Sequence, residues 1–165
     1  MWVRDRFVDQ YVVDTSGLIR EQQIAACRSV LQFVAADVDH FQCDVPWGER
    51  ESWPREVVQA AAILAPLTEG TPSKKEYKHT GWVREFSDVT WQAFVVFAPY
   101  AYSADAWTVD MKSLAEIEDE GTSLVVRVPP AKLRQLEQAI PNADIVPLGE
   151  WRKRKKQNPN RSTGG

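Results

Sequence analysis

The sequence predicts an α+β fold, in which helices and strands occur in separate runs rather than in regular alternation. Three observations support this class. Apolar residues recur every three or four positions over residues 18–36, as they do on one face of a helix. Nine of the 17 aromatic residues lie between Tyr77 and Trp107, in a block typical of strands. Residues 124–148 then contain two β-branched runs that flank a helical stripe.

The N-terminal half is predicted to form one strand and two helices. Residues 3–13 are rich in β-branched and aromatic side chains, which favours a first strand. The stripe over 18–36 predicts the first helix. Residues 39–53 contain proline, glycine and several charges, and predict a loop. A serine and a proline near residue 54 are typical of a helix start and place a second helix at 54–64, before a long exposed connection over 66–81.

The aromatic block predicts an antiparallel meander. Strands are expected at about 82–86, 90–98 and 106–112, where β-branched and aromatic residues are dense. The segment SLAE at 113–116 matches a capping box, and Gly121 is suited to end a helix. A short helix is therefore predicted after the third strand.

The C-terminal part is predicted to form a strand at 124–128, a helix at 131–140 and a strand at 143–148. A helical crossover of this kind is expected to set its two strands parallel and side by side. Residues 151–165 contain no apolar side chain after Trp151 and are predicted to be disordered when free. The predicted organisation is a single acidic domain over residues 1–150 with a basic flexible tail.

Composition and charge limit the class of protein. A chain of 165 residues, 44% of them hydrophobic, suits one domain with a substantial core. Residues 1–150 hold 14 Lys and Arg against 23 Asp and Glu, a net charge of −9, whereas residues 151–165 carry +6. Two cysteines, Cys27 and Cys43, form no disulfide framework and are expected to be reduced. The charged start lacks the apolar core of a signal peptide, and these features predict a cytoplasmic protein without membrane spans.

One stretch suggests metal-dependent chemistry. In WTVDMKS, residues 107–113, a strand would place Asp110 and Lys112 on the same face. With Asp88 as an upstream acid, this arrangement resembles the pattern of restriction-endonuclease-like nucleases. That resemblance implies two carboxylates holding Mg²⁺ or Mn²⁺ and a lysine that orients the attacking water.

The register of the predicted hairpin decides whether these acids meet. A turn at Pro99 would set Asp88 opposite Asp110. A turn at Ala104 would separate the two by roughly 33 Å along the strand at the usual rise. Ser103 and Asp105 favour the second turn. The nuclease is therefore the alternative hypothesis, and the favoured interpretation assigns no catalytic residue, metal or cofactor.

The segment DVDHFQCD, residues 37–44, contains possible metal ligands. His40 and Cys43 could supply two ligands to zinc, but a structural site needs four and no pattern supplies the others. A Cys–His nucleophile pair would also need an orienting residue, and none is evident. We expect this segment to be a polar helix end and loop.

Basic and aromatic residues alternate over residues 74–86. Single-stranded nucleic acid is bound by such a combination of phosphate contacts and base stacking, which gives a third hypothesis. Trp82 and Phe86 are nevertheless expected to point inward. The basic tail is the clearer polyanion-binding feature. The candidate nucleic-acid contacts are Lys74, Lys75, Lys78, Arg84, Arg152, Lys153, Arg154, Lys155, Lys156 and Arg161.

The favoured interpretation is a non-catalytic interaction protein, of the kind that neutralises a partner or takes part in phage or nucleoprotein assemblies. The acidic body would bind a protein partner, and the basic tail would contact nucleic acid or an acidic surface. Large aromatic residues in loops or at element ends are the expected centre of the interface. These candidates are Trp47, Trp53, Tyr100 and Tyr102.

Overall fold

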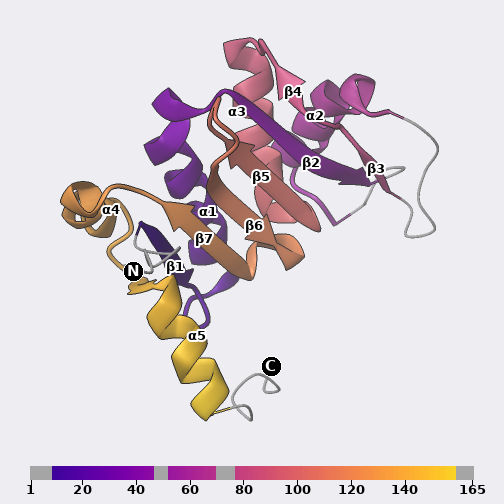
Figure 1. Ribbon diagram of the computed structural model, residues 1–165. Coiled ribbons are helices and arrows are strands. Elements are labelled where there is room, and N and C mark those ends of the chain that lie inside the picture. Colours follow the sequence, from indigo (N-terminus) through magenta and orange to yellow (C-terminus); the bar gives the residue numbers. More distant parts are fainter. Residues whose placement is uncertain (1–8, 47–51, 70–76, 159–165) are drawn as a thin grey trace.

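The computed structural model, which describes residues 9–46, 52–69 and 77–158, confirms the α+β class. Its strands form one antiparallel sheet in the order β3-β2-β5-β6-β7-β1-β8, and β4 pairs with β2 (Figure 1). The strands are β1 Gln10–Asp14, β2 His40–Pro46, β3 Tyr77–His79, β4 Val83–Arg84, β5 Ser103–Trp107, β6 Ser113–Glu118, β7 Ser123–Arg127 and β8 Asp144–Pro147. The helices are α1 Arg20–Val34, α2 Arg55–Leu64, α3 Asp88–Phe97, α4 Leu133–Ala139 and α5 Leu148–Gln157.

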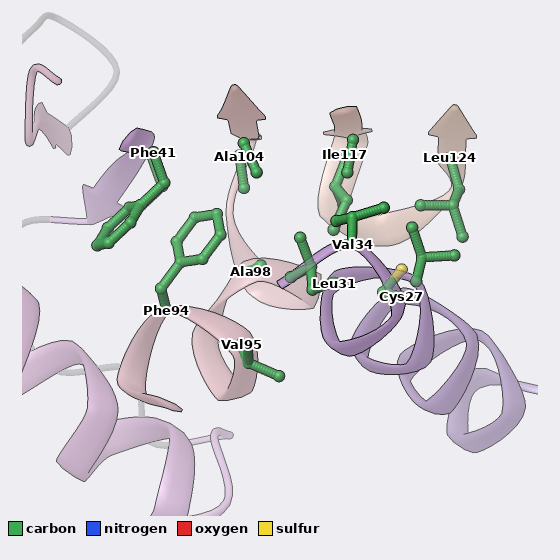
Figure 2. Packing of buried hydrophobic residues seen from close by; sticks show 14 of the residues in the cluster. Cys27, Leu31, Val34, Phe41, Phe94, Val95, Ala98, Ala104, Ile117 and Leu124 are labelled. Carbon is green, nitrogen blue, oxygen red and sulfur yellow. The ribbon is translucent and has the colours of Figure 1, made fainter. Parts of the chain in front are cut away.

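The core lies between one face of the sheet and the helices α1, α2 and α3, which Figure 1 shows behind the sheet. Side chains alternate along each strand, so every second residue points to the helices. Figure 2 shows this layer: Phe41, Ala104, Ile117 and Leu124 descend from β2, β5, β6 and β7 towards the helices. The opposite side chains of these four strands therefore form a second face.

The helix α1 confirms the prediction from periodicity. Cys27, Leu31 and Val34 are buried against the sheet, at the spacing of one helical face. At its start, Arg20 donates hydrogen bonds to the carbonyls of Pro99 (2.8 Å) and Glu120. These bonds connect α1 to the turns before β5 and after β6, and thereby fix the sheet against the helix. The second predicted helix, at 54–64, is also confirmed as α2.

The predicted strand at 90–98 is wrong, because residues 88–97 form the helix α3. The hydroxyl of Ser87 caps the helix by accepting from the Thr90 amide (3.2 Å), and Pro99 follows shortly after its end. Trp91, Phe94 and Val95 are all buried. Since α3 is apolar around most of its circumference, its sequence lacks the polar positions that reveal a 3.6-residue period.

Two further predictions near the sheet centre are wrong. Within the predicted loop at 39–53, residues 40–46 form the central strand β2, and residues 113–118 form the strand β6 rather than a helix. In both strands, polar and charged residues alternate with apolar ones, which is the pattern of a sheet with one polar face. Gly121 lies in the β6–β7 turn with φ +84°, and a Cβ there would lie 3.1 Å from Cys27 Sγ.

Other boundaries differ by less. The strand predicted at 82–86 is reduced to the two-residue β4, and the one predicted at 106–112 ends at Trp107. The first strand, predicted at 3–13, is described from Gln10, and residues 3–8 lie outside the described part. Within the connection predicted at 66–81, residues 77–79 form β3.

The C-terminal strand, helix and strand are confirmed as β7, α4 and β8, but the two strands are not neighbours. Strand β1 lies between them and pairs antiparallel with both. The basic segment also differs from the prediction, because residues 148–157 form the helix α5. Lysine, arginine and glutamine favour helices, and the Glu150–Arg154 ion pair joins adjacent turns of α5. Residues 159–165 lie outside the described part.

Candidate interaction surface

Four carboxylates gather on the sheet face that α1, α2 and α3 leave uncovered. They are Asp44 on β2, Asp105 on β5, and Glu116 and Glu118 on β6, and we call this group the acidic face. The strand register brings them together, since Asp105 lies opposite both Gln42 and Glu116. Residues two apart on a strand share a face, so Asp44 and Glu118 extend the same patch. In Figure 1 this face of β2, β5 and β6 is turned towards the viewer.

Burial and neighbouring negative charges raise the pKa of two members of the acidic face, Asp105 and Glu118. Burial raises the pKa of Asp105 from 3.8 to about 6, and the negative charges of Glu118, Glu116 and Asp44 add to this effect. The Gln42 amide donates to Asp105 (3.2 Å) and opposes the rise. Burial and neighbouring acids also raise the pKa of Glu118, although Ser103 donates to it (3.0 Å).

Little positive charge compensates this patch. The imidazole Nδ1 of His79, on β3, lies 2.6 Å from Asp44. Within the described part of the chain, Asp105, Glu116 and Glu118 form no ion pair with a Lys, Arg or His. Asp44 is buried and already contacts His79, so Asp105, Glu116 and Glu118 are the carboxylates of this face that a cationic ligand would reach and stabilise.

Aromatic side chains border the acidic face at the β3 end. Tyr77 and His79 share the face of Asp44, because the register pairs Asp44 with His79. The Tyr102 ring, 38% exposed, lies 5.5 Å from that of Tyr77. Tyrosine in such a position combines apolar area with a hydroxyl, which suits it to the centre of an interface.

A second aromatic group lies where β2 begins and β5 ends, and we call it the Trp corner: Asp39, His40, Trp82, Arg84 and Trp107. The buried His40 ring lies 5.3 Å from Trp82 and is stacked on Trp107 at 6.4 Å. Trp82 is 52% exposed, with the Arg84 guanidinium 5.6 Å from its ring. Arg84 also donates to Asp39 (2.8 Å). Exposed tryptophan beside arginine is typical of interface hot spots.

The helix α5 carries positive charge away from the sheet (Figure 1). Arg154 is paired with Glu150, and Lys155 lies 5.5 Å from the Trp151 ring. At 3.6 residues per turn, the other cations of the helix lie within an arc of about 160° that excludes Arg154. Cations near a helix C-terminus are also favoured by the helix dipole. The four residues on this arc are Arg152, Lys153, Lys155 and Lys156.

The predicted nuclease residues do not lie on the expected strands. Asp88 is the first residue of α3, whereas Asp110 and Lys112 lie in the turn between β5 and β6. Lys112 Nζ is 3.6 Å from Asp110, and the Thr108 hydroxyl donates to the same carboxylate (2.5 Å). That hydrogen bond, more than Lys112, lowers the pKa of the exposed Asp110. These contacts stabilise a solvent-exposed turn.

Of the predicted partner-binding residues, Tyr102 borders the acidic face, whereas two others pack on the core. The Trp53 ring meets those of Phe97 (5.6 Å) and Tyr100 (6.3 Å), and both Trp53 and Tyr100 are half-buried. Arg20 further covers Tyr100, with its guanidinium 5.2 Å from the ring. Trp47 lies outside the described residues.

The predicted nucleic-acid residues are scattered. Lys74, Lys75 and Arg161 lie outside the described part. Lys78 pairs with Val45, so it points to the helix side of the sheet, and Arg84 belongs to the Trp corner. Phe86 packs on the core as expected, but Trp82 does not point inward, because it precedes the two-residue strand β4. Among the described residues, α5 is the element that gathers several of these cations.

The segment 37–44 does not form a metal or nucleophile site. His40 is buried on the face of β2 opposite the helices, whereas Cys43 points into the core, where burial raises the pKa of its thiol. Burial likewise raises the pKa of Cys27 to about 12. Among the described residues, no group of three or more His, Cys, Asp and Glu could hold a metal ion.

An open groove of about 500 Å³ lies next to the Trp corner. Its charged residues are already engaged in part: Arg127 donates to Asp9 (2.6 Å) and to the Ser113 carbonyl (2.9 Å). Asp39 accepts from Arg84 and contacts His40. The remaining charged residues of the groove are Asp37 and Lys132. They do not form an acid–base pair beside a nucleophilic side chain.

No protein family, curated protein or solved structure matches this chain. Among the helices that the structure describes, none is long and apolar enough to cross a membrane. Function is therefore inferred from the surface itself.

The acidic face is not among the sites that the sequence predicts. Its four carboxylates come from two strands that were predicted as a loop and a helix, and from β5, which was placed too late. The alternation of QCDV on β2 and of LAEIE on β6 was the available signal. The Trp corner was missed for the same reason.

Proposed function

We propose that this protein is a non-catalytic interaction protein that binds a basic protein partner on the acidic face. The observation that supports this most is the crowding of Asp105 with Asp44, Glu116 and Glu118 on a sheet face without an overlying α1, α2 or α3. Tyr102 and Trp82 border the patch and supply apolar anchors. Aromatic residues are enriched at protein interfaces, and a patch of one charge sign gives specificity for a partner of the opposite sign.

Electrostatics would favour a cationic partner in two ways. Lysine or arginine from the partner would relieve the repulsion among Asp105, Glu116 and Glu118, which lowers the free energy of the complex relative to the free protein. The net charge of −9 over residues 1–150 would also steer a basic protein towards the body and raise its association rate.

Charge reversal on the acidic face tests this function. The full chain and the variant Glu116→Lys/Glu118→Lys are used as baits in a lysate of the source cell, and bound proteins are identified. We expect a basic partner that the full chain retains and the variant loses. The control Glu21→Lys/Glu137→Lys makes the same change in net charge at exposed positions of α1 and α4. Equal retention of the partner by both variants, or only acidic partners, would contradict the proposal.

A second interaction is supported by α5. Its four cations on one arc could contact the phosphates of a nucleic acid, in keeping with the charge of the tail, while the acidic body would be repelled from them. The helix α5 would then connect the protein partner, bound on the sheet, to a polyanion. An acidic protein surface is the competing ligand of α5.

The salt dependence of binding distinguishes these ligands. If the four cations each neutralise one phosphate, the affinity for duplex DNA should fall with salt at a log–log slope of about −3.6. Replacing Arg152, Lys153, Lys155 and Lys156 by Gln should remove most of that slope in a fluorescence-anisotropy titration. Replacing Arg154 alone should change the salt dependence least among the cations of α5, because Arg154 is paired with Glu150. A slope unchanged by the fourfold variant would exclude α5 as the DNA contact.

The metal-dependent nuclease stays a prediction from the sequence that the geometry does not favour, because Asp110 and Lys112 lie in an exposed turn. Incubation with DNA or RNA and Mg²⁺ or Mn²⁺ tests it directly. Cleavage that is lost in Asp110→Ala would restore it.

A further inference from the structure

Two buried nitrogens of the Trp corner have no hydrogen-bond partner among the described residues: His40 Nε2 and Trp107 Nε1. His40 and Trp107 lie opposite each other on β2 and β5, with their rings 6.4 Å apart and 5° from parallel. A polar atom buried without a partner destabilises the folded state, so such an atom is expected to be satisfied by water, an ion or a ligand. The His40 side chain is fully buried, which makes its free nitrogen especially unusual.

The two nitrogens have opposite hydrogen-bonding roles. His40 Nδ1 lies 2.8 Å from an Asp39 carboxylate oxygen, and a carboxylate only accepts, so Nδ1 carries the proton. In neutral imidazole this leaves Nε2 as an acceptor. The indole Nε1 of Trp107 can only donate. The Trp corner thus offers one acceptor and one donor on residues that lie opposite each other on β2 and β5.

Trp82 lies against His40 but is not held by the core. Its ring lies 5.3 Å from His40 and is 52% exposed, so a rotation of Trp82 exposes little further apolar area.

We propose that the Trp corner binds the side-chain amide of an asparagine or glutamine from the protein partner. The amide N–H₂ donates to His40 Nε2, and its carbonyl accepts from Trp107 Nε1–H. An ammonium group has no acceptor for the indole, and a carboxylate would be repelled by Asp39. The amide is planar, as are the aromatic rings around it. The inference rests on the proposed function, because it names the anchor of the same partner.

Acetamide is the probe that tests this site without the partner. In the ¹⁵N-labelled full chain, we expect the indole N–H signal of Trp107 to shift saturably on titration, with a dissociation constant on the order of millimolar or weaker for so small a ligand. Acetone can accept from the indole but cannot donate to His40. It should therefore bind about three- to tenfold more weakly. His40→Phe keeps a ring and should bring acetamide to the level of acetone.

The controls separate this inference from the proposed function. Glu116→Lys/Glu118→Lys should bind acetamide as the wild type does, because its substitutions lie outside the Trp corner. If His40→Phe does not fold, the comparison of acetamide with acetone on the wild type decides. An unshifted Trp107 signal, or equal binding of acetone, would overturn the inference and leave the two nitrogens to ordered water. Capture of a basic partner by the acidic face would be unaffected by that result.

Discussion

Replacement of Asp105 by Asn should stabilise the protein at pH 7–8 by up to about 3 kcal/mol, since each unit of pKa shift corresponds to about 1.36 kcal/mol. The wild-type carboxyl has its pKa raised from 3.8 to about 6 by burial and by Glu118, Glu116 and Asp44. Ionising it therefore costs more in the folded than in the unfolded chain. Asn removes that cost and keeps an oxygen that can accept from Gln42.

The effect has a defined pH range. Between pH 3.8 and about 6 the folded protein retains a proton on Asp105 that the unfolded chain has lost. The free energy of unfolding of the wild type therefore falls as pH rises through this range. Above the range, Asp105 causes no further change with pH. Below pH 3.8 both states are protonated, so Asp105→Asn and the wild type should be equally stable.

Urea unfolding at pH 3.5, 5 and 8 measures this difference. Asp144→Asn, at an exposed position of β8, is the matched control and should stay within about 0.5 kcal/mol of the wild type. Destabilisation by Asp105→Asn at pH 8 would show that the carboxylate is held by a favourable partner, contrary to the crowded acidic face. A stabilised variant that binds the partner less well would indicate that Asp105 serves binding rather than folding.

Replacement of Phe94 by Ala should destabilise the protein by about 3–5 kcal/mol. The side chain is fully buried, and its ring is stacked on Phe41 of β2 at a centroid distance of 4.2 Å (Figure 2). Its loss leaves a cavity between α3 and the sheet, which neighbouring backbone cannot fill. Packing of Phe94 therefore contributes much of the contact between α3 and β2, the strand that bears His40 and Asp44.

A residue on the same helix supplies the control. Val89 is 64% exposed, so Val89→Ala should change the free energy of unfolding by less than about 0.5 kcal/mol. Chemical denaturation of both variants gives the comparison. Similar small losses for both would place Phe94 outside a packed core and would contradict the position of α3.

The sequence predicted those elements whose periodicity is visible locally. For α1 and α4, apolar stripes stand out against polar neighbours, and β7 is a β-branched run closed by two prolines. In α3, burial on several sides removes that contrast, and its valines and aromatics imitate a strand. The position of β1 between β7 and β8 is a long-range pairing that no local pattern encodes.

The candidate site lies on strands whose type or position the sequence did not predict. Residues of the acidic face are 11 or more positions apart between strands, and only the register of β2, β5 and β6 joins them. The charge of the basic segment is evident from its composition, but its helix is not. The ion pair of Glu150 with Arg154 stabilises that helix and depends on the spacing of the two residues, which composition does not show. Tyr102 was identified from its place at an element end and does border the acidic face.

The central claim is that strands β2, β5 and β6 crowd four carboxylates onto one uncovered face. A site-resolved NMR titration of the Asp105 carboxyl carbon tests it most directly, in the wild type and in Glu118→Gln. We predict a pKa of about 6 in the wild type and a lower pKa in the variant, which lacks a neighbouring negative charge. A wild-type pKa near 3.8, unchanged by Glu118→Gln, would contradict the acidic face and the function inferred from it.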